Sequence, residues 1–153
     1  MVRAPFQVLI YPYRSIREDR LEYAVFKRAD ESFWQGISGG GEDSESPLEA
    51  ARREAFEEAG LAPDLDYLLL DTVNSIPVTF YKDSHLWGDH VYVVPQYCFG
   101  VRAGDCMITL SREHTEYCWL PYEEARVRVK YDGAKTALWE LDRRLTGRGL
   151  RDS

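Results

Sequence analysis

The segment from Ser46 to Gly60 is where the sequence most narrowly limits what the chain can fold into. Ser46 is a favourable N-cap residue, Pro47 suits the first helical position, and Glu49 completes an S-x-x-E capping box. Gly60 supplies the left-handed residue that ends many helices. One face carries small residues that permit close packing: Ala51, Ala55 and Ala59. We therefore expect a helix over Pro47–Ala59 that packs by its alanine face.

The remaining segments predict a mixed sheet with a second helix. Stretches rich in β-branched and aromatic residues indicate strands at Phe6–Tyr13, Leu21–Lys27, Phe33–Ile37, Leu65–Tyr81, Val91–Arg102 and Thr115–Leu120. Three consecutive glycines, Gly39–Gly41, predict a tight loop, and Ser15–Arg20 predicts a turn. Apolar residues at helical spacing predict a C-terminal helix: Ala134, Leu138, Leu141 and Leu145. The irregular order of strands and helices favours a mixed sheet over a regular βαβ repeat.

Composition limits the classes of protein that remain. The 153 residues suit one domain, and a hydrophobic content of 44% is too high for a disordered chain. No apolar run approaches the roughly 18 residues that span a bilayer, and the N-terminus lacks a signal-peptide pattern. Three cysteines without C-x-x-C spacing indicate neither a disulfide framework nor a zinc site. We expect a single cytoplasmic domain over residues 1–153 that binds no membrane.

Acidic residues are concentrated in one short window. The net charge is −7, and residues 42–58 hold seven acids and two arginines, which give −5. This excess argues against binding of duplex nucleic acid. Glu54, Glu57 and Glu58 share one helical face, and Arg53 lies one turn before Glu57. Crowded carboxylates suit Mg²⁺ or Mn²⁺, although a solvated acidic face is the alternative for such a run.

The acidic run belongs to a longer pattern. Gly39 is followed after five residues by Glu45, and after seven more by Arg53-Glu54-Ala55-Phe56-Glu57-Glu58-Ala59-Gly60-Leu61. This pattern resembles the Nudix box, G-x5-E-x7-R-E-U-x-E-E-x-G-U, in which U is a bulky apolar residue. Every fixed Gly, Glu and Arg matches, and only Ala55 is smaller than usual. The resemblance implies an α+β Nudix fold, with a mixed β-sheet sandwiched between helices.

The resemblance also implies roles for individual residues. Nudix enzymes hydrolyse a nucleoside diphosphate linked to another moiety, with Mg²⁺ as cofactor and Mn²⁺ as a substitute. Glu54, Glu57 and Glu58 would be metal ligands, with Glu45 and the backbone carbonyl of Ser38 as further candidates. Arg53 would hold the acidic face in place by ion pairing. Glu54 is also one of two candidates for the general base.

The second candidate base lies outside the box. Phe33-Trp34-Gln35 and the stretch from Arg112 to Leu120 are similar to a bacterial group that contains dihydroneopterin triphosphate and dATP pyrophosphohydrolases. In that group the Glu before His, here Glu113, is a loop carboxylate that faces the metals. The alternatives are that Glu113 is an exposed loop acid, or that Glu116 takes its place. Glu116 is expected on the following strand.

Other residues are weaker candidates for substrate binding. Lys27 and Arg28 lie at a strand end on opposite faces, so at most one of them is expected to contact phosphate. Trp34 could stack on a base or lie in the core, and Lys135 could reach the substrate from the last helix. The three histidines have no mutual metal spacing and are interpreted as structural or surface residues: His85, His90 and His114.

Three functional classes follow from this pattern. The first is a Mg²⁺-dependent Nudix pyrophosphohydrolase acting on a small nucleotide-like substrate, a dNTP or dihydroneopterin triphosphate, with ADP-ribose, a dinucleoside polyphosphate or 5′-triphosphate RNA as alternatives. The second is another enzyme on the same scaffold, such as an isoprenyl diphosphate isomerase, and the third is a binding module. The complete set of box carboxylates favours the first. A homodimer is compatible with all three.

Overall fold

The protein is built on one mixed sheet of seven strands. The computed structural model describes residues 2–17 and 20–147. The strands are β1 (Arg3–Arg17), β2 (Arg20–Arg28), β3 (Trp34–Gln35), β4 (Ile37–Glu42), β5 (Tyr67–Pro77), β6 (Val93–Arg102) and β7 (His114–Leu120). Their order is β3-β2-β1-β6-β5, while β4 also pairs with β1 and β7 also pairs with β2. Strands β1 and β6 run parallel and the other pairs are antiparallel, so the sheet is mixed as predicted.

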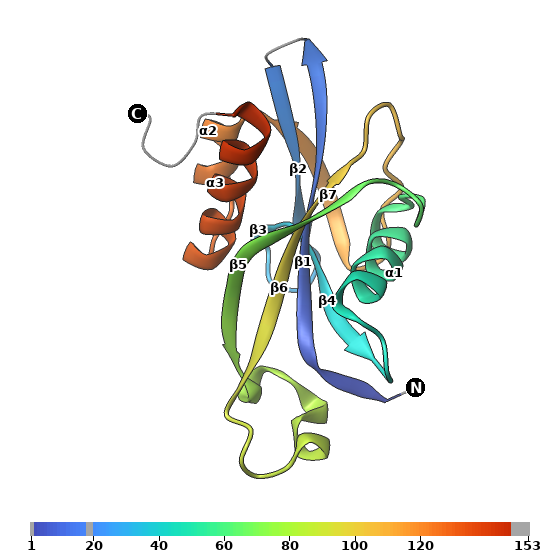
Figure 1. Cartoon of the computed structure of the whole chain (residues 1–153), viewed down its shortest axis with the longest axis vertical. Helices are drawn as coiled ribbons and strands as arrows, with labels where there is room; N and C mark the ends of the chain where they lie inside the picture. Colours follow the sequence, from blue (N-terminus) through green and yellow to red (C-terminus); the bar gives the residue numbers. More distant parts are fainter. Residues whose placement is uncertain (1, 18–19, 148–153) are drawn as a thin grey trace.

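Helices cover both faces of this sheet. Figure 1 shows α1 (Pro47–Ala59) on one side and α2 (Tyr122–Arg128) with α3 (Asp132–Thr146) on the other. Two short 3₁₀ helices, Val78–Phe80 and Lys82–Trp87, extend beyond the end of β5. The expected α+β sandwich is therefore confirmed. Within the described residues, no helix is long and apolar enough to cross a membrane.

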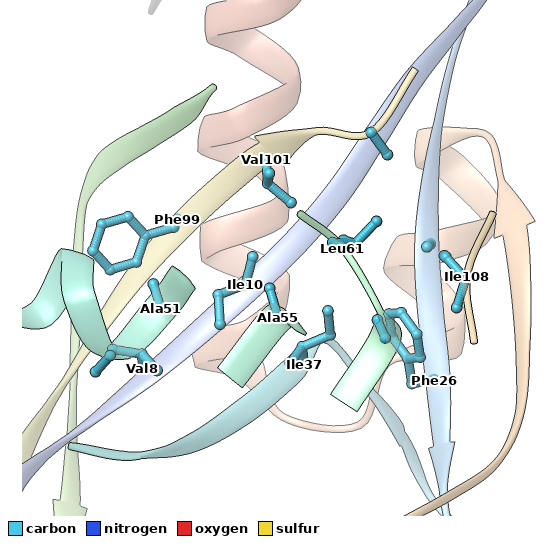
Figure 2. Packing of buried hydrophobic residues seen from close by; sticks show 14 residues of the cluster. Val8, Ile10, Phe26, Ile37, Ala51, Ala55, Leu61, Phe99, Val101 and Ile108 are labelled. Carbon is cyan, nitrogen blue, oxygen red and sulfur yellow. The ribbon is translucent and has the colours of Figure 1, made fainter. Parts of the chain in front are cut away.

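Each interface between helix and sheet has its own core. Under α1, the small side chains of Ala51 and Ala55 lie against Val8, Ile10 and Phe99 of the sheet (Figure 2). The second core lies between the sheet and α3, where Leu138 and Leu141 are fully buried. Removal of such apolar surface from water is the main stabilising contribution to a fold of this kind. The alanine face predicted for α1 is thus the face that packs.

Both ends of α1 are capped as the sequence predicts. The Ser46 side chain accepts a hydrogen bond from the Glu49 N–H at 3.1 Å, and the Glu49 carboxylate accepts one from the Ser46 N–H at 2.8 Å. Gly60 adopts the left-handed conformation with φ 70°. These contacts satisfy backbone groups at the helix ends. The acidic face of α1 therefore rests on a rigid support.

The prediction of a tight loop at Gly39–Gly41 is wrong. All three glycines lie in β4, where Gly39 and Gly40 pair with β1, and none of them has a positive φ. They are needed for close approach, because a Cβ on Gly39 would overlap the Glu54 carboxyl group and one on Gly41 would overlap the Phe6 ring. Sequence rules for glycine do not distinguish a turn from such crowding.

Several strand ends also differ from the expectation. The predicted turn at Ser15–Arg20 is too long, because β1 continues to Arg17 and β2 begins at Arg20; Glu18 and Asp19 lie outside the described residues. The expected long strand from Leu65 ends at Pro77, where the 3₁₀ helices begin. Helix α2 was not expected; its N-cap is Pro121, which makes no side-chain capping bond.

Candidate active site

Three glutamates project from α1 as one acidic cluster. An oxygen atom from each of Glu54, Glu57 and Glu58 lies within 4.8 Å of the others. Glu54 and Glu58 are buried, at 7% and 6% exposed, whereas the Glu57 side chain is half exposed. The helical spacing predicted from the sequence therefore brings the three carboxylates together.

Arg53 is the cation that holds this cluster. Its guanidinium donates to Glu45 at 2.8 and 3.0 Å, to Glu54 at 3.0 Å and to Glu57 at 3.2 Å. It also donates to the carbonyl oxygen of Gly40 at 2.8 Å and thereby ties α1 to β4. The planar guanidinium can satisfy this many acceptors at once, which an ammonium group cannot. The prediction that Arg53 pairs with Glu57 is confirmed, but Glu45 is its shortest carboxylate contact.

Glu45 and Ser38 are the two further candidate ligands, and both have partners within the protein. Glu45 accepts from Arg53 and from the Glu42 N–H at 2.9 Å, and the Arg53 hydrogen bond leads the effects that lower the pKa of its carboxyl. Glu45 is thus engaged in holding Arg53. Ser38 lies in β4 next to Gly39, and its hydroxyl accepts from Gln35 Nε2 at 2.9 Å.

The buried carboxyls have raised pKa values. Burial raises the pKa of Glu54 to about 7, against the opposing effect of Arg53, and the charges of Glu57 and Glu58 raise it further. Burial likewise raises the pKa of Glu58, which the Ser111 hydroxyl lowers and the neighbouring Glu113 raises. Burial and neighbouring carboxylates both disfavour the charged form of such a group. A divalent cation would supply compensating positive charge.

A loop before β7 packs against the C-terminal end of α1. Ser111 N–H donates to the Glu58 carbonyl at 3.1 Å, and the Ser111 hydroxyl donates to the Glu58 carboxylate. His114 is 4% exposed, and its Nδ1 lies 3.8 Å from Glu58 Oε2. Neither ring nitrogen of His114 has a hydrogen-bond partner among the described residues. His114 is thus structural and buried, as one of the sequence interpretations had it, but it lies beside a site carboxylate.

Glu113 and Glu116 occupy different environments. Glu113 lies in the turn that precedes β7, its carbonyl accepts from the Ala29 N–H at 2.9 Å, and its side chain reaches the main cleft of the protein. Glu116 lies on β7, as expected, and pairs with Lys27 at 3.6 Å. The effect of Glu113 on the pKa of Glu58 indicates that these two carboxyls are close. The ion pair with Lys27 directs the Glu116 carboxylate toward β2 instead.

The cleft has a volume of about 800 Å³ and reaches Gly39, against which the Glu54 carboxyl group lies. One wall is formed by β4 at Ser38–Gly40, and the floor by Gln7, Gln96 and Asn74 of β1, β6 and β5. Aromatic rings line it near α3 (Phe33 and Tyr131) and at the 3₁₀ helices (Phe80 and Tyr81). Its size suits a small organic ligand. Glu113 is the carboxylate that lines it on the side of the cluster.

The four predicted substrate contacts divide between the cleft and other places. Arg28 lines the cleft and pairs with Asp30 at 2.8 Å, whereas Lys27 does not line it. Trp34 packs against the core under α3, with the Arg128 guanidinium 5.0 Å from its ring centre. The Lys135 ammonium donates to the carbonyls of Arg126 and Val129, both at 2.6 Å, and so caps the end of α2.

Arg3 was missed by the sequence analysis. Its side chain lines the cleft and lies against Gly40, where an added Cβ would come within 2.6 Å of Arg3 Cδ. Its guanidinium makes no hydrogen bond or ion pair among residues 2–17 and 20–147, so it is available to an anion. Its carbonyl accepts from Trp87 Nε1 at 2.8 Å. An arginine on a strand carries no motif that could have singled it out.

The arrangement of box, sheet and helices agrees with comparison to known families. Residues 15–143 match the NUDIX domain, which is most of the chain. The chain belongs to the Nudix family. This membership confirms the prediction of a Nudix-type phosphoanhydride hydrolase.

Individual Nudix proteins resemble the chain over most of its length. An RNA pyrophosphohydrolase of Roseobacter denitrificans is 30% identical over 131 residues, which cover 76% of this chain and 82% of the relative. The structure of a protein from Listeria monocytogenes described as a NUDIX hydrolase is 39% identical, with a TM-score of 0.84 over 95% of this chain and 97% of that one. The dihydroneopterin triphosphate pyrophosphohydrolase of Escherichia coli shares the fold, with a TM-score of 0.72, 19% identity and coverage of 97% and 99%.

The acidic cluster of Glu54, Glu57 and Glu58 has the chemistry of a site for a hard divalent cation. Three carboxylates offer oxygen atoms within 4.8 Å of one another, and two of the three are buried on a capped helix. Oxygen ligands of this kind suit Mg²⁺ and Mn²⁺. Burial leads the effects that raise the pKa of Glu54, and Arg53 opposes it. The residues present therefore fit the metal.

Proposed function

We propose that the protein is a Mg²⁺-dependent pyrophosphohydrolase that cleaves a nucleoside triphosphate-like compound, a dNTP or dihydroneopterin triphosphate. The observation that carries this proposal is the common location of the acidic cluster and Glu113. Gly39, which lies under the Glu54 carboxyl group, and Glu113 both line the same cleft. A phosphate chain bound there would lie between metal ligands and a separate carboxylate.

The site residues have distinct roles in the proposed reaction. Glu54, Glu57 and Glu58 would hold Mg²⁺, with the Ser38 carbonyl as a further ligand, and Mn²⁺ could substitute. When bound, a divalent ion neutralises phosphate oxygens and lowers the pKa of a water molecule. Arg53 keeps Glu54 and Glu57 in position through one hydrogen bond to each, and is itself held by Glu45 and the Gly40 carbonyl. Arg28 and Arg3, which line the cleft, would bind the phosphates.

Glu113 is the better candidate for the general base. Glu54 is held by Arg53 at 3.0 Å and is committed to the metal, whereas Glu113 lies on a separate turn. A base must come within about 2.6–3.2 Å of the proton that it takes. A carboxylate outside the ligand set can approach the attacking water without leaving the metal.

5′-Triphosphate RNA is the second candidate substrate. The relative from Roseobacter denitrificans, an RNA pyrophosphohydrolase, supports it. Both substrates present the same triphosphate to the site. The net charge of −7 disfavours long RNA, because an anionic surface repels the phosphates that lie outside the cleft. We therefore place the small nucleotide first.

A substrate panel tests the proposal. The protein is stripped with EDTA and assayed with and without Mg²⁺ on dATP, dGTP, dCTP, dihydroneopterin triphosphate, ADP-ribose, a dinucleoside tetraphosphate and 5′-triphosphate RNA. The double variant Glu54→Gln/Glu58→Gln serves as the blank for contaminating phosphatase. We expect Mg²⁺-dependent release of pyrophosphate from a small triphosphate, absent in the blank. Turnover that is independent of Mg²⁺, or higher kcat/KM on RNA, would contradict it.

A further inference from the structure

We propose that Gln7, Gln96 and Asn74 form an amide row that binds the edge of a two-ring heterocycle, a purine or a pterin, in the substrate. This inference rests on the proposed function, because the heterocycle is the part of the substrate that lies beyond the phosphates. It assigns the choice among nucleotide-like substrates to three neutral side chains outside the Nudix box.

The sheet places these three amides side by side. Gln7 on β1 is the register partner of Gln96 on β6, and Gln96 is in turn the partner of Asn74 on β5. Partners in neighbouring strands project from the same face of a sheet. Gly40 of β4 pairs with Gln7 on its other side, and the adjacent Gly39 lies against the Glu54 carboxyl group of α1. The row therefore begins at the strand against which the acidic cluster rests.

Hydrogen bonds within the row leave specific groups for a ligand. Asn74 Nδ2 donates to Gln96 Oε1 at 2.9 Å, which fixes the orientation of the Gln96 amide and leaves its NH₂ group available. Gln7 is 6% exposed and lines the cleft, yet its side chain makes no hydrogen bond to any of the described residues. The Gln7 amide is therefore open to the cleft, where a ligand that supplies both a donor and an acceptor can replace water.

The surroundings of Asn74 hold the row in place. The register of β5 shifts between Leu69 and Val73, and there the N–H groups of Asp71 and Thr72 donate to the Glu140 carboxylate of α3 at 2.6 and 2.8 Å. Gly133 at the start of α3 lies so close to the Asn74 amide that a Cβ would overlap it. Asn74 is therefore fixed by the strand and by the helix above it.

The dimensions and charge of the row select the class of ligand. Neighbouring strands lie about 4.8 Å apart, so three amides in register offer donors and acceptors over about 10 Å. A single six-membered ring reaches two strands at most, whereas a fused two-ring system carries polar atoms along a longer edge. The row is uncharged, which suits a neutral heterocycle better than a phosphate. The cleft also has rings for the apolar faces of such a ligand, at Phe33, Tyr131, Phe80 and Tyr81.

Two measurements test the row. In the first, kcat/KM with Mg²⁺ is compared for dATP, dCTP and methyl triphosphate, which has no base. We expect the wild type to prefer dATP over dCTP by at least about tenfold, because a buried polar site discriminates against ligands that leave it unpaired. Gln96→Met and Gln7→Met should each lower kcat/KM on dATP about tenfold more than on methyl triphosphate, mainly through KM.

The second measurement does not depend on turnover. Calorimetric titration in EDTA with the α,β-methylene analogues of dATP and dCTP should show tighter binding of the purine by the wild type and equal binding of the two by Gln96→Met. The matched control is Val73→Ala, on the residue before Asn74, which is exposed and does not line the cleft and which should retain the preference. Gln7 is buried, so its replacement puts folding at risk. If Gln7→Met does not fold, the test of the amide row rests on Gln96→Met alone.

The outcomes separate this inference from the proposed function. Mg²⁺-dependent hydrolysis without preference for the purine overturns the amide row and leaves the pyrophosphohydrolase intact. Equal losses of Gln96→Met on dATP and methyl triphosphate also overturn it. Absence of turnover on every substrate overturns the proposed function, and the metal-free titration then still decides whether the row binds a purine.

Discussion

The carboxyl group of Glu54 occupies the space that the side chain of residue 39 would need if that residue were not glycine. The glycine of the Nudix box thus has a packing role, because it lets the Glu54 carboxylate, a proposed metal ligand, lie directly on β4. Arg53 fixes the same contact from the other side through the Gly40 carbonyl, at 2.8 Å. These two contacts join β4 to α1 at the acidic cluster, where the positions of the carboxylates must be most rigid.

Gly39→Ala should therefore displace Glu54. We expect a loss of about 1–3 kcal/mol in the free energy of unfolding, as for overpacked sites, and weaker Mg²⁺ binding in a calorimetric titration. Gly40→Ala is the matched comparison, because its neighbours are the ends of the Arg3 and Gln7 side chains, which can move. Mg²⁺ affinity that is equally reduced in both variants would contradict this role of Gly39.

Glu58→Gln should inactivate the enzyme without unfolding it. The variant removes a metal ligand, and we expect kcat to fall by at least about a hundredfold. Its metal-free stability should be equal or slightly higher, because repulsion with Glu54 and Glu57 is relieved. Steady-state kinetics and urea unfolding in EDTA measure the two quantities. Normal Mg²⁺-dependent turnover would exclude Glu58 as a ligand.

Arg53→Ala should lower both stability and rate. The side chain is 21% exposed and contacts carboxylates of Glu45, Glu54 and Glu57, so its removal leaves buried negative charge. We expect a loss of about 3 kcal/mol in urea unfolding without metal. Arg53→Lys keeps the charge but lacks the planar fork, and it should recover only part of the loss. Full recovery by lysine would show that charge alone matters.

The stability of the metal-free protein should fall as the pH rises. Burial raises the pKa of Glu54 from its ordinary value of 4.5 to about 7, so the folded state binds the proton more tightly than the unfolded state does. Its contribution is fully present below about pH 4.5 and is lost as the pH rises through 7, by roughly 3 kcal/mol in total. Urea unfolding in EDTA at pH 5–8 measures the slope. Glu54→Gln should remove the part of the slope that Glu54 contributes. An unchanged slope in this variant would show that another group causes the pH dependence.

Glu113→Gln should reduce kcat strongly while KM and stability change little. If Glu113 transfers a proton, additional Mg²⁺ does not restore the rate. Glu116→Gln is the matched control, because Glu116 lies three residues further on and pairs with Lys27 at 3.6 Å. Single-turnover rates across a Mg²⁺ series test both variants. A larger defect in Glu116→Gln, or rescue of Glu113→Gln by Mg²⁺, would refute the assignment.

The parts of the molecule that local rules determine could be predicted from the sequence. Helix α1, its caps and its acidic face depend on residues within four positions of one another, and all were found. The floor of the cleft could not be found in this way, because Gln7 and Gln96 meet only through the register of two strands that are distant in the sequence. Lys135 shows the same limit, since its carbonyl partners on α2 belong to a helix without a recognisable cap.

The hydrogen bond from Trp87 to the Arg3 carbonyl joins the second 3₁₀ helix to the first strand. The rim of the substrate cleft therefore includes the third residue of the chain, far from any glutamate of the Nudix box. Proteolytic trimming of the first few residues would remove a guanidinium from the cleft and release Trp87 at the same time. An N-terminally clipped preparation would keep an intact metal site and still be an enzyme of altered substrate affinity.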